Sequence, residues 1–248
     1  LIHFESVRLR AEVYLDGKLV AYDIIGESPF DADITDAVQP GKEQCLAVRV
    51  TNPGGNFHWQ DFNEMYWGKY QIPPGRSFGG IIGRVRLDAV SPVYVSDIYM
   101  QNQPERTKVK AILTVNNTSA KTEKQDIYFS VCEKENPGKV ILEKKLPRVA
   151  LKQGTNVVTM ELHCPDARIW DLDTPYLYVC GVDVKSGKKL SDHAAQTFGF
   201  RWFEPVGIGK DAMLRLNGRR IMLRTAISWG YWPATGLYAT PEMAEKQV

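Results

Sequence analysis

The stretch richest in side chains that could do chemistry is "NPGGNFHWQDFNEMYWGKYQIPPGRSF", which occupies residues 52–78. It interleaves aromatic residues such as Trp59 and Trp67 with amides and carboxylates such as Asp61. An aromatic face offers a stacking surface and a carboxylate accepts hydrogen bonds, so together they suit recognition of a sugar ring and its hydroxyls. We therefore predict Trp59, Asp61 and Trp67 as substrate-binding residues. Docking of these aromatics against a neighbouring domain is at least as strong an interpretation.

Other reactive residue types give no comparable signal. The four cysteines form no CxxC pair and no Cys/His spacing of the kind that holds zinc, so we expect neither a metal site nor a cofactor. Cys132 and Cys180 fall inside predicted strands, where a thiol behaves as a small apolar group, and we expect free cysteines in place of disulfides. His58 is interpreted as a polar loop residue and not as a catalytic base.

The elements that must position this loop begin with "AEVYLDGKLVAYD". Alternating apolar residues on either side of Asp16-Gly17, a two-residue turn that tolerates positive φ, predict a β-hairpin. Further strands are expected around Phe30 to Ile34, over the segment that ends "LAVRV", and at "GRVRLDAV" after the loop. The segment from Asn52 to Gly80 is predicted as one long loop without regular structure, which in a compact domain is usually functional or disordered.

A second block of strands runs from about residue 92 to 203. Seven segments of strand-like alternation are separated by turn residues, which is typical of an immunoglobulin-like sandwich, although the Cys…Trp…Cys spacing of antibody domains is missing. The predicted strands are "VYVSDIYM", "KVKAILTVNN", "DIYFSVCEK", "KVILEKKL", "NVVTMELH", "PYLYVCGVDVK" and "AAQTFGFRWF".

In the last part of the chain, the sequence pattern changes from that of strands to that of a helix. "EPVGIGKDA" is predicted as a Gly/Pro linker, and "MLRLNGRRIMLRTAISW" as a hairpin that turns at Asn217-Gly218. Thr240, Pro241 and Glu242 then form a helix start. Only eight residues follow Thr240, fewer than the roughly 12–15 at which isolated helices become marginal. A strand, a loop and a first helix are how a (β/α) barrel begins, so we expect a truncated barrel start.

Composition excludes several classes of partner. The formal net charge of +2 arises from 31 basic and 29 acidic residues spread along the chain, so neither nucleic acid nor an anionic membrane is an expected partner. No apolar run approaches the roughly 20 residues that cross a bilayer. The N-terminus lacks the long apolar stretch of a signal peptide, but it reads as a cut end, which leaves the compartment open with a slight preference for a periplasmic or secreted location.

Five motifs resemble glycoside hydrolase family 2, the β-galactosidase, β-glucuronidase and β-mannosidase group. "VYLDGKLVAYDIIGESPFDADITDAVQPGKEQCLAVRV" and "GGIIGRVRL" are similar to its jelly-roll sugar-binding domain. "WDLDTPYLYVCGVDV" and "FGFR" resemble its W-x-P-x-x-P-x-L-Y and F-G-F-R motifs, and "LNGRRIMLRTAISW" its entry to the barrel. The motifs occur in the family's order and cover nearly the whole chain.

The resemblance implies a retaining, exo-acting glycosidase, in which two glutamates on later barrel strands act as acid and nucleophile. We therefore expect no catalytic residue here, and pairs such as Asp171/Asp173 or Glu242/Glu245 are assigned to a turn and a helix start. The jelly roll also looks incomplete at its N-terminus. The expected ligand of the parent enzyme is a β-linked carbohydrate, and its oligomeric state stays open, a homo-oligomer included.

Two departures from the family pattern concern the barrel entry. Ile227 and Trp229 stand where the family has Asn and His, which argues against a simple β-galactosidase. "SWGYWP" instead places Trp229 and Tyr231 at the end of the first barrel strand, the face where barrel enzymes keep their active sites. We predict both as substrate-binding residues that stack on sugar, with packing at the barrel rim as the alternative.

The expected fold is mainly β, and it has three parts. Residues 1–90 are predicted as a galactose-binding-like jelly-roll sandwich, 91–203 as an immunoglobulin-like β-sandwich, and 204–248 as linker, hairpin and first helix of a truncated (β/α)8 barrel. The alternative function is a stand-alone carbohydrate-binding module, which does not explain the hairpin and helix after residue 212. A surface adhesion protein built of immunoglobulin-like repeats is disfavoured because residues 1–90 and 91–203 share no similarity.

Overall fold

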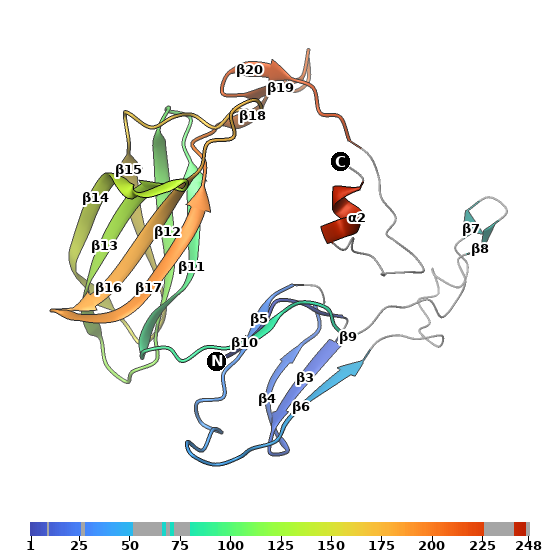
Figure 1. Ribbon diagram of the computed structural model, residues 1–248, viewed down its shortest axis with the longest axis vertical. Helices are drawn as coiled ribbons and strands as arrows, with labels where there is room; N and C mark the ends of the chain where they lie inside the picture. The colour runs from blue at the N-terminus through green and yellow to red at the C-terminus, as the bar shows by residue number, and fades with distance from the viewer. Residues whose placement is uncertain are drawn as a thin grey trace. The chain divides into compact units, whose positions relative to one another are not determined.

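The computed structural model describes residues 1–8, 10–25, 28–51, 66–67, 70–71, 80–225 and 241–246 (Figure 1). Nearly every element is a β-strand, which confirms the mainly-β prediction. The chain forms two compact units, here called unit 1 and unit 2. Unit 1 comprises Leu1–Ala89 and Ala226–Val248, and unit 2 comprises Val90–Thr225.

Unit 1 contains two three-stranded antiparallel sheets with the orders β10-β1-β5 and β4-β3-β6, and the two-stranded pairs β2-β9 and β7-β8. The hairpin of β3 and β4 turns at Asp16 and Gly17, whose φ angles of 48° and 80° are those that such a turn requires. The strands are β1 (Ile2–Phe4), β2 (Val7–Arg8), β3 (Arg10–Leu15), β4 (Lys18–Asp23), β5 (Phe30–Ala32), β6 (Leu46–Thr51), β7 (Tyr66–Trp67), β8 (Tyr70–Gln71), β9 (Gly80–Ile81) and β10 (Val85–Leu87).

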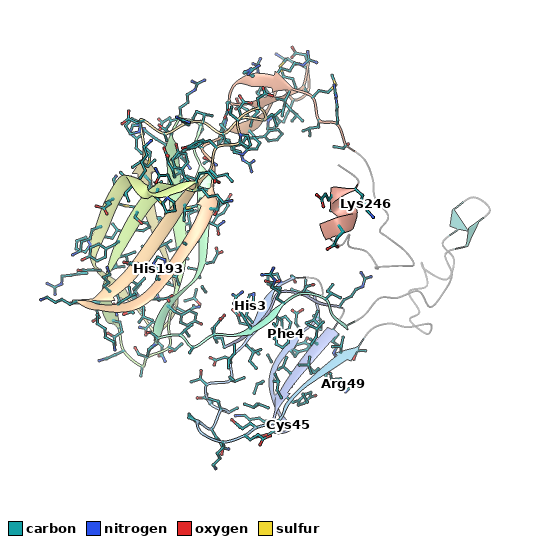
Figure 2. The ribbon with its side chains drawn as sticks, in the orientation of Figure 1. His3, Phe4, Cys45, Arg49, His193 and Lys246 are labelled. Carbon is teal, nitrogen blue, oxygen red and sulfur yellow. The ribbon has the colours of Figure 1, made fainter. Side chains whose placement is uncertain are left out.

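Apolar side chains from both three-stranded sheets form the core of unit 1, as in a jelly-roll sandwich. Phe4 on β1 is 1% exposed and stacks on Phe30 of β5 with ring centroids 4.9 Å apart (Figure 2). The other sheet contributes Ala11, Val13 and Leu15 of β3. They are alternate residues of one strand, so their side chains share the face that points into the core. The fully packed interior is small, and β10 remains exposed along its length.

One prediction for this unit needs correction. The segment from Asn52 to Gly80 was expected to lack regular structure, but β7 and β8 pair within it, Tyr66 with Gln71 and Trp67 with Tyr70, and β9 begins at Gly80. Between Trp67 and Tyr70 there is room for only a two-residue connection that includes Gly68, and such short connections favour hairpins.

Unit 2 is built around the predicted immunoglobulin-like sandwich. One sheet has the order β11-β12-β15 and the other the order β14-β13-β16-β17, all antiparallel. Figure 1 shows the two sheets as facing layers. The seven strands are β11 (Val93–Asn102), β12 (Lys108–Asn117), β13 (Glu123–Glu133), β14 (Asn136–Leu151), β15 (Gly154–His163), β16 (Tyr178–Ser186) and β17 (Lys189–Phe198).

The core of the sandwich follows from strict alternation in its central strands. Along β12 and β16, every second side chain is buried, and the other half faces outward. The inward side chains of both sheets form one cluster, in which Phe129, Tyr178 and Phe200 are each 1% exposed. A two-layer core of this kind is the usual origin of stability in β-sandwiches.

A small third sheet, β18-β19-β20, completes unit 2. β19 (Met213–Leu216) and β20 (Arg219–Ile221) form the predicted hairpin, and Asn217 and Gly218 have φ angles of 51° and 83°. The predicted linker is partly wrong, because β18 (Phe203–Val206) extends into it and pairs with β19. β18 lies at the edge of this sheet, a position in which a strand tolerates a proline such as Pro205. The helix α2 (Pro241–Glu245) begins at the expected proline, and the rest of the expected barrel start lies outside the described residues.

Gly199 lies directly beneath the side chain of Trp170, and this contact yields a stability prediction. A Cβ atom built on Gly199 would lie 2.9 Å from Cβ of Trp170 and 3.0 Å from its Cδ1. Gly199→Ala therefore forces Trp170 or the backbone to move. It is expected to lower the free energy of unfolding by about 1–3 kcal/mol in urea titrations. Gly138→Ala, where the nearest atom is 3.7 Å away, is the control and should change it by less than about 0.5 kcal/mol. Equal effects would contradict the steric argument.

Candidate functional site

Most of the residues predicted from sequence to bind substrate lie outside the described part of the chain. These are Trp59, Asp61, Trp229 and Tyr231. Trp67 is the exception, since its backbone belongs to β7 and pairs with Tyr70 of β8. Their role in substrate binding therefore stays a prediction.

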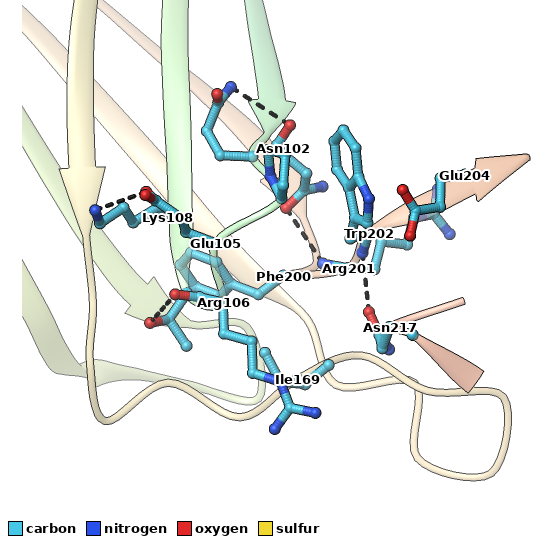
Figure 3. A pocket seen from close by; sticks show the side chains of 14 residues that line it. Asn102, Glu105, Arg106, Lys108, Ile169, Phe200, Arg201, Trp202, Glu204 and Asn217 are labelled. Atoms are coloured by element: carbon cyan, nitrogen blue, oxygen red, sulfur yellow. Dashed lines mark hydrogen bonds and ion pairs between the residues drawn. The ribbon is translucent and has the colours of Figure 1, made fainter. Parts of the chain in front are cut away.

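Within the described residues, unit 2 contains a hollow of about 250 Å³, here called the junction hollow (Figure 3). It lies where the β11–β12 connection, the segment after β17 and the turn of the β19–β20 hairpin meet. Buried Phe200 and half-buried Ile169 contribute apolar walls. The lining residues are Asn102, Gln103, Pro104, Glu105, Arg106, Thr107, Lys108, Ile169, Phe200, Arg201, Trp202, Glu204, Asn217 and Gly218.

Two asparagine side chains fix the backbone around the junction hollow. Asn102 Nδ2 donates to the Gly199 carbonyl at 3.0 Å, and its Oδ1 accepts from the Arg201 amide at 3.2 Å. Asn217 Nδ2 donates to the Trp170 carbonyl at 2.9 Å, and its Oδ1 accepts from the Trp202 amide at 2.9 Å. Each amide therefore uses both its donor and its acceptor on the main chain. The walls are held in place by bonds between segments that are distant in sequence.

The remaining polar side chains of the junction hollow differ in whether they have partners. Glu105 forms an ion pair with Lys108 at 2.6 Å, and the hydrogen bond from Lys108 lowers the pKa of Glu105. Among the residues that the structure describes, the carboxylate of Glu204 and the guanidinium of Arg106 have neither an ion-pair nor a hydrogen-bond partner. Their hydrogen-bonding capacity is available to a ligand.

Trp202 and Glu204 project from the same side of their segment, because they are two residues apart in extended chain. Figure 3 shows them next to each other, with Asn217 at the amide of Trp202. The neighbouring Arg201 holds its guanidinium 4.7 Å from the ring centroid of Trp170, a cation–π contact. Arg201 also lines a second, more open hollow beside Tyr99 and Gln196. The "FGFRW" segment thus contributes both packing and exposed polar groups.

The outer face of the four-stranded sheet carries charged groups that already have partners. Asp183 contacts Lys185 at 2.8 Å and His193 at 2.7 Å (Figure 2). Asp126 contacts Lys145 at 2.7 Å, and both lysines lie over the ring of Tyr128. Burial acts to raise the pKa of Asp183, but its hydrogen bonds from Lys185 and His193 outweigh this effect and lower it. These ion pairs and cation–π contacts link neighbouring strands across the sheet surface.

A second charged cluster lies on β3 in unit 1. The nearly buried Glu12 accepts hydrogen bonds from Arg10, Arg49 and the Tyr14 hydroxyl. The bond from Tyr14, followed by the charges of Arg49 and Arg10, lowers the pKa of Glu12 despite the opposing effect of burial. Glu12 is therefore an ionised, fully paired carboxylate and not a candidate general acid.

The cysteines are free, as predicted, and two of them are poor nucleophiles. Burial raises the pKa of the Cys164 thiol to about 11 and that of Cys180 to about 12. A thiol must lose its proton to act as a nucleophile or metal ligand. Across the described residues there is no group of three His, Cys, Asp or Glu side chains that could hold a metal ion, and no helix long and apolar enough to span a membrane.

Sequence reasoning did not single out the residues of the junction hollow. Asn217 was identified only as a turn residue, and Trp202 and Glu204 were divided between a predicted strand and a predicted linker. The one local signal was the alternation of "WFEPV", which places Trp202 and Glu204 on one side. The hydrogen bonds that hold the walls of the hollow join residues 15 to 99 positions apart in sequence, and local patterns do not reveal such pairs.

Comparison with known proteins gives consistent matches. The family profile of Glycosyl hydrolases family 2 matches residues 93–201. A β-glucuronidase of Formosa agariphila is 26% identical over 94% of this chain and 24% of its own length. A β-galactosidase of Thermoanaerobacterium thermosulfurigenes is 27% identical over 99% of this chain and 33% of its own.

Solved structures agree on the fold. A crystal structure of a Bacteroides uniformis β-glucuronidase superimposes with a TM-score of 0.74, at 23% identity, over 99% of this chain and 29% of that one. The chain therefore spans about a quarter to a third of the length of these relatives. The family profile and the relatives agree with the five sequence motifs in supporting a fragment of a family 2 glycosyl hydrolase, and the solved structures agree with its fold.

Proposed function

We propose that the chain is the non-catalytic N-terminal and middle part of a retaining, exo-acting glycosidase that hydrolyses β-linked O-glycosides. The observation that carries this proposal is the alignment of nearly the whole chain with a β-glucuronidase and a β-galactosidase that are three to four times longer. The described carboxylates with lowered pKa values are paired in structural contacts, as Glu12 and Asp126 illustrate. The catalytic glutamates are accordingly proposed to lie in the parent enzyme outside these residues.

The proposed domain boundaries are those expected from sequence, with 1–90, 91–203 and 204–248 as the three parts. No sheet among the described residues contains strands from both sides of residue 91. The compact units divide at almost the same place, between Ala89 and Val90, but unit 2 also includes the β18–β20 sheet. The hydrogen bonds of Asn217 to Trp170 and Trp202 explain why this hairpin groups with the sandwich.

The test of the proposed function compares the chain with its parent. The parent is expected to cleave an aryl β-glycoside with retention of configuration, detected by NMR as the first anomer released, because two carboxylates act in succession. Purified chain 1–248 is expected to show no turnover above a mock purification from the same host. Turnover by the chain itself, or inversion by the parent, would show that this assignment is wrong.

Substrate contact by the predicted aromatic and acidic residues is tested in the same parent. Trp59, Asp61, Trp67, Trp229 and Tyr231 are proposed to border the sugar site. Asp61→Ala and Trp229→Ala are each expected to lower kcat/KM about fivefold or more, since losing a sugar contact removes about 1–3 kcal/mol of binding. Tm should stay nearly constant. If both variants keep parental kinetics, these residues are packing elements.

A further inference from the structure

We propose that the junction hollow of unit 2 binds one neutral pyranose unit of a glycan. This site uses Trp202, Glu204 and Arg106, and none of the residues predicted from sequence to bind substrate. Three properties of the hollow support the proposal, namely its charges, its apolar surface and its preformed walls.

The charges of the hollow favour a neutral ligand that both donates and accepts hydrogen bonds. Glu204 offers acceptors and Arg106 offers donors, and within the described chain neither has a partner. An anionic ligand would meet the carboxylate of Glu204, and a cationic one would meet Arg106 and Arg201. Hydroxyl groups suit both charged side chains, since each hydroxyl can donate a hydrogen bond to a carboxylate and accept one from a guanidinium.

The apolar surface of the hollow supplies the second element of sugar recognition. Trp202 is half-buried and contributes to the wall, while Phe200 and Ile169 form apolar surface nearby. An indole face suits contact with the C–H face of a pyranose ring and still leaves its N–H as a donor. A flat aromatic ring next to a carboxylate therefore matches a ligand with one apolar face and a polar rim.

The size and rigidity of the hollow favour one sugar unit. Its volume of about 250 Å³ is just below the range of roughly 300–1,000 Å³ that is typical of sites for drug-sized ligands. Asn102 and Asn217 hold the surrounding backbone through four hydrogen bonds of 2.9 to 3.2 Å. Because the walls are already ordered, binding does not need to order them.

The experiment titrates the purified chain with methyl β-D-galactopyranoside and follows the indole N–H signals of the protein's tryptophans by NMR. The Trp202 signal, assigned with Trp202→Phe, is expected to shift saturably with sugar concentration. Methyl β-D-glucuronide should bind more weakly, because its carboxylate faces Glu204. The proposal is overturned if no indole signal shifts up to the solubility limit of the neutral sugar, or if the glucuronide binds more tightly.

A matched pair of variants separates the hollow from nonspecific effects. Glu204→Gln keeps the shape of the side chain and is expected to weaken binding about tenfold, since a hydrogen bond to a charged carboxylate is stronger than one to a neutral amide oxygen. Glu143→Gln on the exposed surface of β14 is the control and should leave the dissociation constant unchanged. Equal affinity of the two variants would place the sugar elsewhere. If binding fails while the parent still cleaves β-glycosides, only this inference falls.

Discussion

Replacing Tyr178 with alanine is expected to lower the free energy of unfolding of unit 2 by about 3–5 kcal/mol, the largest effect among the substitutions considered. Tyr178 is 1% exposed at the start of β16, and its ring lies 5.2 Å from that of Phe200 and 5.3 Å from that of Tyr176, centroid to centroid. Its hydroxyl accepts the Arg168 amide at 2.8 Å. This is the tyrosine corner of immunoglobulin-like sandwiches.

Tyr178→Phe separates the hydroxyl from the ring. It keeps the aromatic packing but leaves the Arg168 amide without its partner, so a loss of about 1–2 kcal/mol is expected. Urea unfolding followed by tryptophan fluorescence measures both variants, because Trp170 and Trp202 belong to unit 2. If Tyr178→Ala costs no more than Tyr178→Phe, the ring does not contribute as its burial indicates.

Asn217→Ala is expected to have the second largest effect. It should lower the free energy of local opening of the β19–β20 hairpin by about 2–4 kcal/mol. Two causes add. The φ angle of 51° is unfavourable for alanine. The side chain also loses two hydrogen bonds, one that it donates to the Trp170 carbonyl and one that it accepts from the Trp202 amide. Hydrogen exchange of the β19 and β20 amides reports this local stability directly.

Asn217→Gly distinguishes the two causes, since glycine adopts positive φ without strain but has no side chain. Faster exchange in both variants, with Asn217→Ala the more affected, is the expected result. If Asn217→Gly exchanges like the unsubstituted chain, the side-chain bonds contribute nothing and the turn conformation alone matters. Asn217→Asp, which keeps the acceptor for the Trp202 amide, should lie between the extremes.

The sequence predicted the sandwich well because its central strands bury every second residue. β12 has the bounds expected, and β16 overlaps the predicted segment 175–185 and ends one residue beyond it, at Ser186. The edges were harder. β17 runs from Lys189 to Phe198, five residues earlier than predicted, because "SDHAAQ" is an edge segment whose outward side chains dilute the apolar pattern. β17 ends at Phe198, within the apolar "FGF". The next residues pack elsewhere, Gly199 beneath Trp170 and Phe200 beside Tyr178.

β14 shows a second kind of limit. It runs from Asn136 to Leu151, whereas the predicted strand "KVILEKKL" covers only residues 139–146 and leaves out Pro137 and Gly138. The pairing moves from Glu133 with Asn136 to Cys132 with Val140, so the residues between them bulge out of the ladder. A bulge accommodates proline and glycine in a strand, and local sequence does not reveal it without the partner strand.

For the candidate site, the sequence predicted the residue types that could bind a sugar but not which residues lie together in space. Aromatic and acidic residues in the 52–80 segment were visible in the sequence, whereas the junction hollow depends on contacts between β11, the segment after β17 and the hairpin turn. Asn102 and Arg201, for example, are 99 residues apart. Long-range juxtapositions of this kind are set by the packing of the whole sandwich and leave no periodic trace.

The long edge strand β14 also bears on the behaviour of this protein in concentrated solution. Among the residues that the structure describes, β14 pairs with β13 on one side only, so its other side lacks a partner strand over its 16 residues. An open edge of this length is a template for pairing with a second molecule and for aggregation. Lys144 and Lys145 are exposed along it, Pro147 lacks an amide hydrogen, and Arg148 has a φ of 51° that interrupts the extended backbone. Charge, proline and irregularity together protect the sandwich from edge-to-edge association.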